Sequence, residues 1–153
     1  MISIETESKL ANIFITLAEG EKSIDINRQI LSEFNDFNPY QIFKFLDIQH
    51  KNHINSSDIL NFLQDRNIVS NELEIKLIIL FYDRDYDGVL SFQEFDNMIQ
   101  SDFSKKQNFS NDTQKLNLSL SNNIEQGLLQ LLENEVELAR KIIDLLDDIK
   151  KKI

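Results

Sequence analysis

One stretch of the sequence decides the fold, and it reads Asp83-Arg84-Asp85-Tyr86-Asp87-Gly88-Val89-Leu90-Ser91-Phe92-Gln93-Glu94. Carboxylates alternate at its first, third and fifth positions, a glycine follows at the sixth, and a longer glutamate closes it at the twelfth. Ca²⁺ prefers about six to eight oxygen ligands, and this spacing supplies them along a tight curve. Gly88 stands where the backbone must turn sharply, a conformation that a side chain penalises. A solvated acidic turn does not explain so many matched positions at once, so the stretch predicts a calcium site.

Two further residues complete the predicted ligand set. Val89 would offer its backbone carbonyl, and Ser91 would reach the ion directly or through a water molecule. The predicted metal ligands are therefore Asp83, Asp85, Asp87, Val89, Ser91 and Glu94. Apolar residues flank the stretch at helical spacing, namely Ile75, Ile78, Ile79 and Tyr82 before it and Phe95, Met98 and Ile99 after it. This pattern predicts a helix–loop–helix unit with one apolar face, which needs a second unit to cover it.

A second copy of the pattern, with its ligands changed, begins at Asp47, which lies 36 residues before Asp83. The apolar frame is kept at the same offset: Ile42, Phe43, Leu46, Ile54, Ile59, Phe62 and Leu63. The ligand positions are not kept, and they hold Gln49, Lys51, Asn52 and Asp58. A lysine ammonium in place of a carboxylate predicts that this loop does not bind Ca²⁺. The matched frames predict that the units pack as a pair, with Ile54 and Leu90 in a short antiparallel bridge.

Both histidines of the chain, His50 and His53, lie in the 47–58 loop. Imidazole is a common ligand of transition metals, which makes a zinc site one interpretation of the pair. Zinc takes about four ligands, and the loop offers no two further well-placed ones. We therefore interpret the two histidines as solvent-exposed loop residues.

A long amphipathic helix is predicted over residues 3–34. Two polar residues, Glu21 and Arg28, fall within its apolar stripe, and Gly20 predicts a weak point at which the helix bends or breaks. The stripe consists of Leu10, Ile13, Phe14, Leu17, Ile24, Ile30 and Leu31. This helix either packs on its own domain or lies on a partner, and the sequence favours neither.

A second strong helix is predicted from Ile124 to Lys152. Its apolar stripe is too wide for a two-stranded coiled coil, and it comprises Leu128, Leu129, Leu131, Leu132, Val136, Leu138, Ala139, Ile142, Ile143, Leu145, Leu146 and Ile149. A soluble monomer rarely leaves such a stripe in water. Three surfaces could cover it, namely a groove of the paired units in the same chain, the 3–34 helix or a protein partner. We expect a partner to bury the 124–149 helix, with the 3–34 helix sharing the contact. Residues 102–123, rich in Ser, Asn, Lys and Gln, predict a flexible linker.

Composition excludes several classes of function. The chain of 153 residues has a net charge of −10, which argues against nucleic acid and anionic membranes as partners. It has no cysteine and no apolar run of the roughly 20 residues that span a bilayer. The start of the chain lacks the basic and apolar regions of a signal peptide, so we expect a cytoplasmic protein.

The calcium loop, its altered sister and their matching apolar frames resemble the calmodulin-like EF-hand superfamily over residues 38–101. This resemblance implies an all-α fold, in which one EF-hand pair of four short helices and two bridged loops lies between long terminal helices. The expected domains are residues 1–35, 36–101, 102–123 and 124–153. The resemblance also implies one bound Ca²⁺, held by the six ligand positions named above.

A narrower likeness rests on residues ahead of and within the first unit. The long helix with Glu21 and Arg28, followed by Asp36-Phe37-Asn38 and Phe43, is similar to a group of EF-hand proteins common in ciliates. Several members of that group belong to cilia and the microtubule cytoskeleton. The likeness implies the same setting, a ciliary axoneme or cytoskeleton, for this chain.

Three functions compete on this basis. The first is a calcium-binding adaptor that docks through its helical arms into a larger assembly. The second is a diffusible calcium sensor that grips target helices in a calcium-dependent way. The third is an enzyme, which we do not expect, because no nucleophile–base pair, phosphate-cradling loop or catalytic metal set is present in the sequence. Promiscuous target grooves rely on flexible methionines, and this chain has only Met1 and Met98, which favours the adaptor.

Overall fold

The computed structural model describes residues 3–101 and 120–152, and within these residues it contains helices and no β-strand. In chain order the helices are α1 (Ile4–Ser32), α2 (Pro39–Leu46), α3 (Ser56–Asp65), α4 (Glu72–Tyr82), α5 (Phe92–Ile99) and α6 (Asn122–Lys152). The expected all-helical class is confirmed for this part of the chain. The predicted linker over 102–123 lies almost wholly outside the described residues, and α6 already begins at Asn122.

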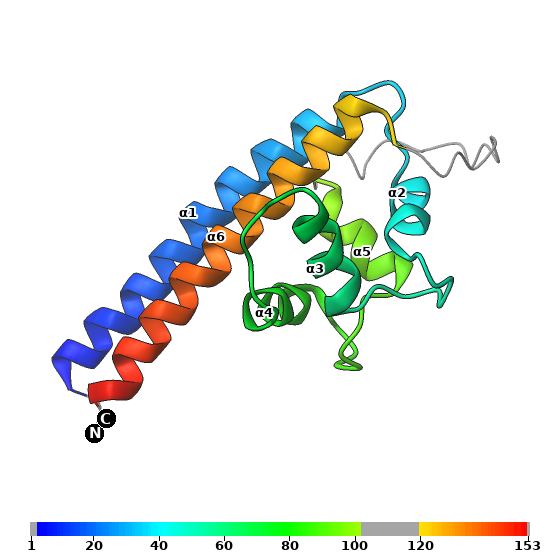
Figure 1. Ribbon diagram of the computed structural model, residues 1–153. Helices are drawn as coiled ribbons and strands as arrows, with labels where there is room; N and C mark the ends of the chain where they lie inside the picture. Colours follow the sequence, from blue (N-terminus) through cyan, green and yellow to red (C-terminus); the bar gives the residue numbers. More distant parts are fainter. Residues whose placement is uncertain (1–2, 102–119, 153) are drawn as a thin grey trace.

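The two long helices form an antiparallel hairpin, which we call the arm. α1 and α6 lie side by side along their length, and the start of α1 and the end of α6 lie together at one tip of the arm (Figure 1). Helices α2 to α5 form a compact body beside the other half of the arm, where α4 packs on α6. The half of the arm with the start of α1 and the end of α6 extends beyond the body (Figure 1).

The short helices of the body begin where the sequence supplies capping groups. Asn38 accepts hydrogen bonds from Tyr40 N and Gln41 N ahead of Pro39, which suits the first helical position. Each later helix starts with a reciprocal capping box, in which the cap and the residue three positions on bond each other's backbone. These boxes pair Asn55 with Asp58, Asn71 with Glu74 and Ser91 with Glu94.

The loops of the body's two helix–loop–helix units are joined by a short antiparallel bridge. Ile54 N donates to Leu90 O and Leu90 N donates to Ile54 O, both at 2.8 Å. The predicted pairing of these two residues is therefore confirmed. Both side chains are fully buried. Phe43 also packs against Phe95 across the units, with ring centroids 5.8 Å apart.

Helix α1 departs from its sequence prediction in two ways. It runs without a break from Ile4 to Ser32, because the gap at Gly20 is filled by the side chain of Leu138 from α6. Two members of the predicted stripe, Phe14 and Ile30, are exposed by 69% and 48%. They lie off the face that α6 covers, so their assignment to the buried stripe was wrong.

The wide stripe of α6 is covered within the chain. Its buried members are Leu128, Leu131, Leu132, Val136, Leu138, Ala139, Ile142 and Ile149, and Ile124 ahead of the stripe is buried as well. α1 and α4 both contact α6, and two neighbouring helices explain a stripe that is too wide for one. Ion pairs fix this packing, including Arg140 Nε to Glu74 Oε2 at 2.6 Å. The expectation that a foreign partner buries the 124–149 helix is therefore corrected, because the chain's own helices supply most of the cover.

Candidate metal centre

The predicted ligand loop lies between two helices whose ends hold it in place. α4 ends at Tyr82, and the backbone N–H of Asp83 still bonds Ile79 O at the end of that helix. α5 begins after Ser91, whose hydroxyl oxygen accepts a hydrogen bond of 3.2 Å from Glu94 N. The first and last residues of the loop are thus tied to rigid helical ends, which fixes the distance that the loop must span.

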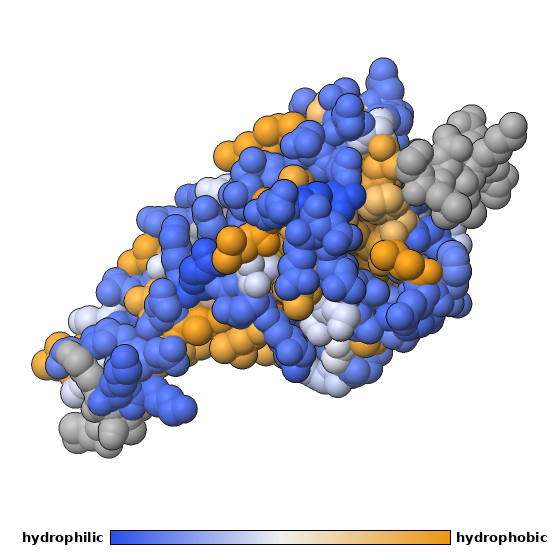
Figure 2. All heavy atoms as spheres, viewed as in Figure 1, coloured by the Kyte–Doolittle hydropathy of each residue, from blue (hydrophilic) through white to orange (hydrophobic). Residues whose placement is uncertain are grey.

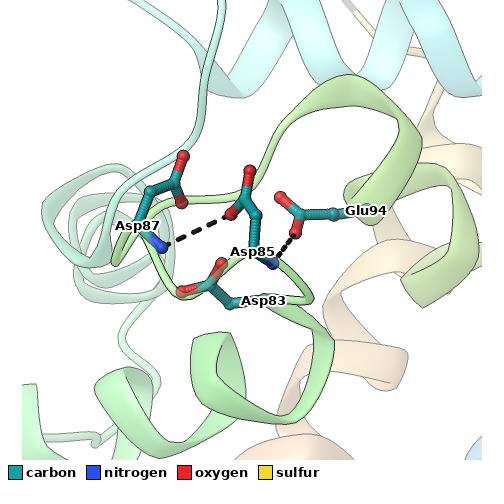
Figure 3. A group of neighbouring side chains, drawn as sticks. All are labelled: Asp83, Asp85, Asp87 and Glu94. Carbon is teal, nitrogen blue, oxygen red and sulfur yellow. Dashed lines mark hydrogen bonds between the residues drawn. The ribbon is translucent and has the colours of Figure 1, made fainter.

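Four of the six predicted ligands come together in space. Oxygen atoms of Asp83, Asp85, Asp87 and Glu94 all lie within 4.8 Å of one another. Figure 3 shows the carboxyl of Asp85 between those of Asp87 and Glu94, with Asp83 below them. Asp83 and Glu94 are buried, whereas Asp85 and Asp87 are exposed. The remaining two, Val89 and Ser91, lie in the same loop, where Ser91 serves as the cap of α5.

Backbone N–H groups orient most of these carboxylates. Asp83 Oδ2 accepts from Gly88 N at 2.8 Å, and Glu94 Oε2 accepts from Arg84 N at 2.6 Å. Gly88 has a φ of +83°, and a Cβ there would meet nothing within 4 Å. Its role is therefore the left-handed backbone turn rather than a close approach to another atom.

One oxygen of the cluster is left without a donor. Asp83 Oδ1 is buried and, with the carboxylates ionised, accepts no hydrogen bond. A buried polar oxygen in this position is costly unless a partner reaches it. Because the atom belongs to the first residue of the loop, whose carboxylate gathers with three others, a cation is the partner that fits.

Crowding shifts two pKa values in opposite directions. Burial works to raise the pKa of Asp83, but hydrogen bonding, chiefly from Gly88 N–H to Oδ2, outweighs it and holds that pKa below its ordinary value. The interaction with the Asp83 carboxyl is the largest cause that raises the pKa of Asp85, and the nearby Asp87 carboxyl adds to the increase. Like charges this close repel each other, so one group retains a proton more readily. A divalent cation would remove that repulsion and would suit a donor set made of hard oxygens.

The sister loop over residues 47–58 resembles the 83–94 loop in its backbone hydrogen bonds to the first residue, but it holds a lysine where the 83–94 loop holds a carboxylate. Asp47 accepts hydrogen bonds from Lys51 N at 3.0 Å and from Asn52 N at 2.7 Å, much as Asp83 accepts from Gly88 N. Asn52 takes the glycine position with a φ of +64°. Lys51 Nζ lies 3.2 Å from Asp58 Oδ2. The lysine ammonium therefore provides an internal positive charge where the other loop gathers only negative charge.

The two histidines do not assemble a site in the described part of the chain. His50 is exposed and His53 is half-buried, and neither belongs to a group of residues that could hold a metal ion there. The zinc interpretation therefore gains no support from their placement.

One polar cluster beside the loop was missed by sequence reasoning. Glu135 in α6 is fully buried and lies next to Tyr82 and the buried Arg28. A signal was present, since Glu135 interrupts the heptad series that passes through Leu128, Leu131, Leu138 and Ile142. An acid in the middle of a buried stripe needs a buried partner.

Comparison of the chain with protein-family models, with curated proteins and with solved structures found no match. No helix in the described residues has both the length and the apolar character needed to cross a membrane.

Proposed function

We propose that the chain binds one Ca²⁺ through residues 83–94 and that its two helix–loop–helix units are an EF-hand pair. The observation that carries the proposal is the buried, unpartnered oxygen of Asp83, whose carboxylate is one of four that the loop gathers. The bridge between Ile54 and Leu90 supports the pairing, and the Lys51–Asp58 contact supports a single ion rather than two. The proposed ligands remain Asp83, Asp85, Asp87, Val89, Ser91 and Glu94.

Calorimetric titration of the full chain with Ca²⁺ tests this proposal. We expect one site, and we expect Glu94→Gln to weaken binding by about 100-fold because it removes a charged, bidentate ligand. Glu72→Gln is the matched control, since Glu72 is an exposed glutamate of α4 outside the loop. Two comparable sites, or a Glu94→Gln variant with unchanged affinity, would contradict the proposal.

We further propose that the protein acts as an adaptor rather than an enzyme, and that it docks through the outer face of α1. This face carries exposed apolar residues at helical spacing: Ile4, Ala11, Phe14, Ile15, Ala18, Ile26 and Ile30. Apolar patches interrupt the hydrophilic surface along the α1 edge of the arm (Figure 2). The exposed charges beside them are mostly acidic, namely Glu5, Glu7, Glu19, Lys22 and Glu33. This combination favours a partner helix with an apolar seam and basic flanks.

Cross-linking mass spectrometry on the native source, followed by a binding assay, tests the docking surface. We expect cross-links from Lys22 to a helix of another protein with flanking Lys or Arg, and weaker binding at high salt. The double variant Phe14→Glu/Ile15→Glu should lose that binding, while Val69→Glu, at a still more exposed apolar residue of the body, should keep it. Cross-links between two copies of α1 would instead assign the face to self-association and would contradict the adaptor proposal.

A diffusible calcium sensor is the alternative function, and it makes the opposite prediction about whether target binding depends on Ca²⁺. A sensor would bind its target only when Ca²⁺ is present, whereas an adaptor docked through α1 stays bound after chelation. We propose a cytoplasmic, ciliary or microtubule-based assembly as the setting, on the strength of the resemblance of the amino-terminal residues to ciliate proteins.

A further inference from the structure

The side chain of Arg28 lies at the junction of the arm and the body. It is only 4% exposed, and it leaves α1 to reach three other helices. Its Nε donates to Met98 O of α5 at 2.7 Å, and its Nη2 donates to the hydroxyl of Tyr82 in α4 at 2.6 Å. The same Nη2 lies 3.7 Å from Glu135 Oε1 of α6.

Two of these contacts fall on the helices that bracket the proposed calcium loop. Tyr82 is the last residue of α4 and immediately precedes Asp83. Met98 lies in α5, four residues after Glu94. Arg28 therefore holds the helix that enters the loop and the helix that leaves it, from outside the loop itself.

The Tyr82 hydroxyl extends the junction to the second helix of the arm. It accepts from Arg28 and donates to Glu135 Oε1 at 2.5 Å. Glu135 is fully buried, and Glu21 bonds the opposite side of the guanidinium. One tyrosine hydroxyl thus connects α1, α4 and α6 at the position next to the first ligand.

The buried charge of Arg28 makes any loss of its contacts energetically costly. A guanidinium stays protonated in proteins, so it cannot avoid the cost of burial by losing its charge. A buried charge that loses its partners destabilises a protein strongly. A shift of Tyr82 relative to Met98 would stretch at least one of the contacts to Arg28 and would meet that cost.

We propose that this junction, formed by Arg28, Tyr82 and Glu135, couples occupancy of the calcium loop to packing of the α1–α6 arm. The inference rests on the proposed calcium function and assigns its regulation to residues outside the ligand set. In the structure the junction is complete and the loop carboxylates are gathered at the same time. Calcium, which stabilises the gathered loop, therefore also stabilises the junction, and by reciprocity an intact junction strengthens calcium binding.

Hydrogen exchange measured by mass spectrometry, together with calorimetry, tests the coupling in the full chain. In the wild type we expect Ca²⁺ to slow exchange in α1 and α6 as well as in the loop. Tyr82→Phe keeps the ring and removes the hydroxyl, so this variant should bind Ca²⁺ about fivefold more weakly. In this variant, Ca²⁺ should no longer slow hydrogen exchange in α1 and α6. Tyr40→Phe is the control, because Tyr40 is a partly exposed tyrosine of α2 away from the junction.

Arg28→Met provides a second variant that removes the charge and keeps much of the side-chain volume. In this variant too, Ca²⁺ should still bind to the loop but should no longer slow hydrogen exchange in α1 and α6. If the wild type binds Ca²⁺ and the exchange of α1 and α6 does not change, the coupling is overturned and the calcium proposal stands. If the wild type does not bind Ca²⁺, both are overturned. Unchanged affinity and an unchanged arm response in Tyr82→Phe and Arg28→Met would overturn the coupling as well.

Discussion

Leu138 of α6 lies directly against Gly20 of α1, where the Cβ of any other residue would stand 2.5 Å from Leu138 Cδ1. The reverse contact occurs further along the arm, where a Cβ at Gly127 of α6 would stand 2.8 Å from Leu31 Cδ1 of α1. Each long helix therefore offers a glycine to a leucine of the other. These two contacts let the helices approach closely and fix how far one can slide along the other.

Gly20→Ala is therefore expected to destabilise the protein, although alanine is the better helix former. In an exposed helix the change would stabilise by about 1 kcal/mol. Here it forces Leu138 out of place, and overpacking costs about 1–3 kcal/mol. Urea unfolding measures the net effect. Combining Gly20→Ala with Leu138→Val should restore part of the loss, and a Gly20→Ala variant more stable than wild type would show that the contact is loose.

Glu135 predicts a pH dependence of stability. Burial is the main cause that raises its pKa from 4.5 to about 7, against the lowering effect of Tyr82 and Arg28. Between these values the folded state binds more protons than the unfolded state, so the free energy of unfolding falls as pH rises. The fall is at most about 1.4 kcal/mol per pH unit and on the order of 3 kcal/mol in total. It ends once the pH exceeds the pKa of the folded state.

Urea unfolding at a series of pH values from 5 to 8 checks this prediction. Glu135→Gln is the control, because an amide does not titrate and leaves the other carboxylates as they are. The wild type should lose stability relative to this variant as pH rises. Parallel curves for the two proteins would assign the pH dependence to other groups.

We expect that a second calcium site can be engineered in the sister loop over residues 47–58. Lys51 supplies the internal charge, so the loop should gain affinity once its ligand positions are restored. The variant is Gln49→Asp, Lys51→Asp, Asn52→Gly and Asp58→Glu together. Calorimetry should then detect two ions per chain, whereas Lys51→Met alone should leave one. If the quadruple variant remains folded and does not bind a second ion, the loop lacks more than its ligands.

Ile54 is expected to support calcium binding without touching the ion. Its side chain is fully buried, and its backbone is paired to Leu90 within the calcium loop. Ile54→Ala should lower stability by about 2–5 kcal/mol and weaken calcium binding measured at a temperature where the variant is folded. Ile48→Ala is the matched control, since Ile48 lies in the same loop and is 68% exposed. Equal calcium affinities in the two variants would argue against mutual support of the loops.

The local parts of this structure were accessible from the sequence, because short-range spacing determines them. The offset that matched Ile54 to Leu90 predicted their bridge, and the alternation of Asp83, Asp85 and Asp87 predicted carboxylates that the fold gathers. Periodicity identifies an apolar face but does not identify which surface covers it. The stripe of α6 was therefore assigned to a partner, although α1 and α4 cover most of it.

Other errors have the same physical origin. α1 is apolar on more than one side, so a heptad reading placed the exposed Phe14 in the buried stripe. Gly20 was interpreted through helix propensity alone, because the leucine that fills its gap comes from a distant part of the chain. The partner of Glu135 was equally remote in sequence. Contacts between far segments require the three-dimensional fold before they can be recognised.

The antiparallel arm also sets an order of events during synthesis. α1 is made before the other described helices, yet α6 starts at Asn122, which follows Ser32 by 90 positions. The body between them contains local helix–loop–helix contacts and can assemble while the chain is still being translated, since domains form in the order in which they emerge. α1 must wait, with its inner face uncovered, until α6 has been translated. The region most exposed to aggregation in a nascent chain is therefore the amino-terminal helix, and a chain that stops before α6 would release it in that state.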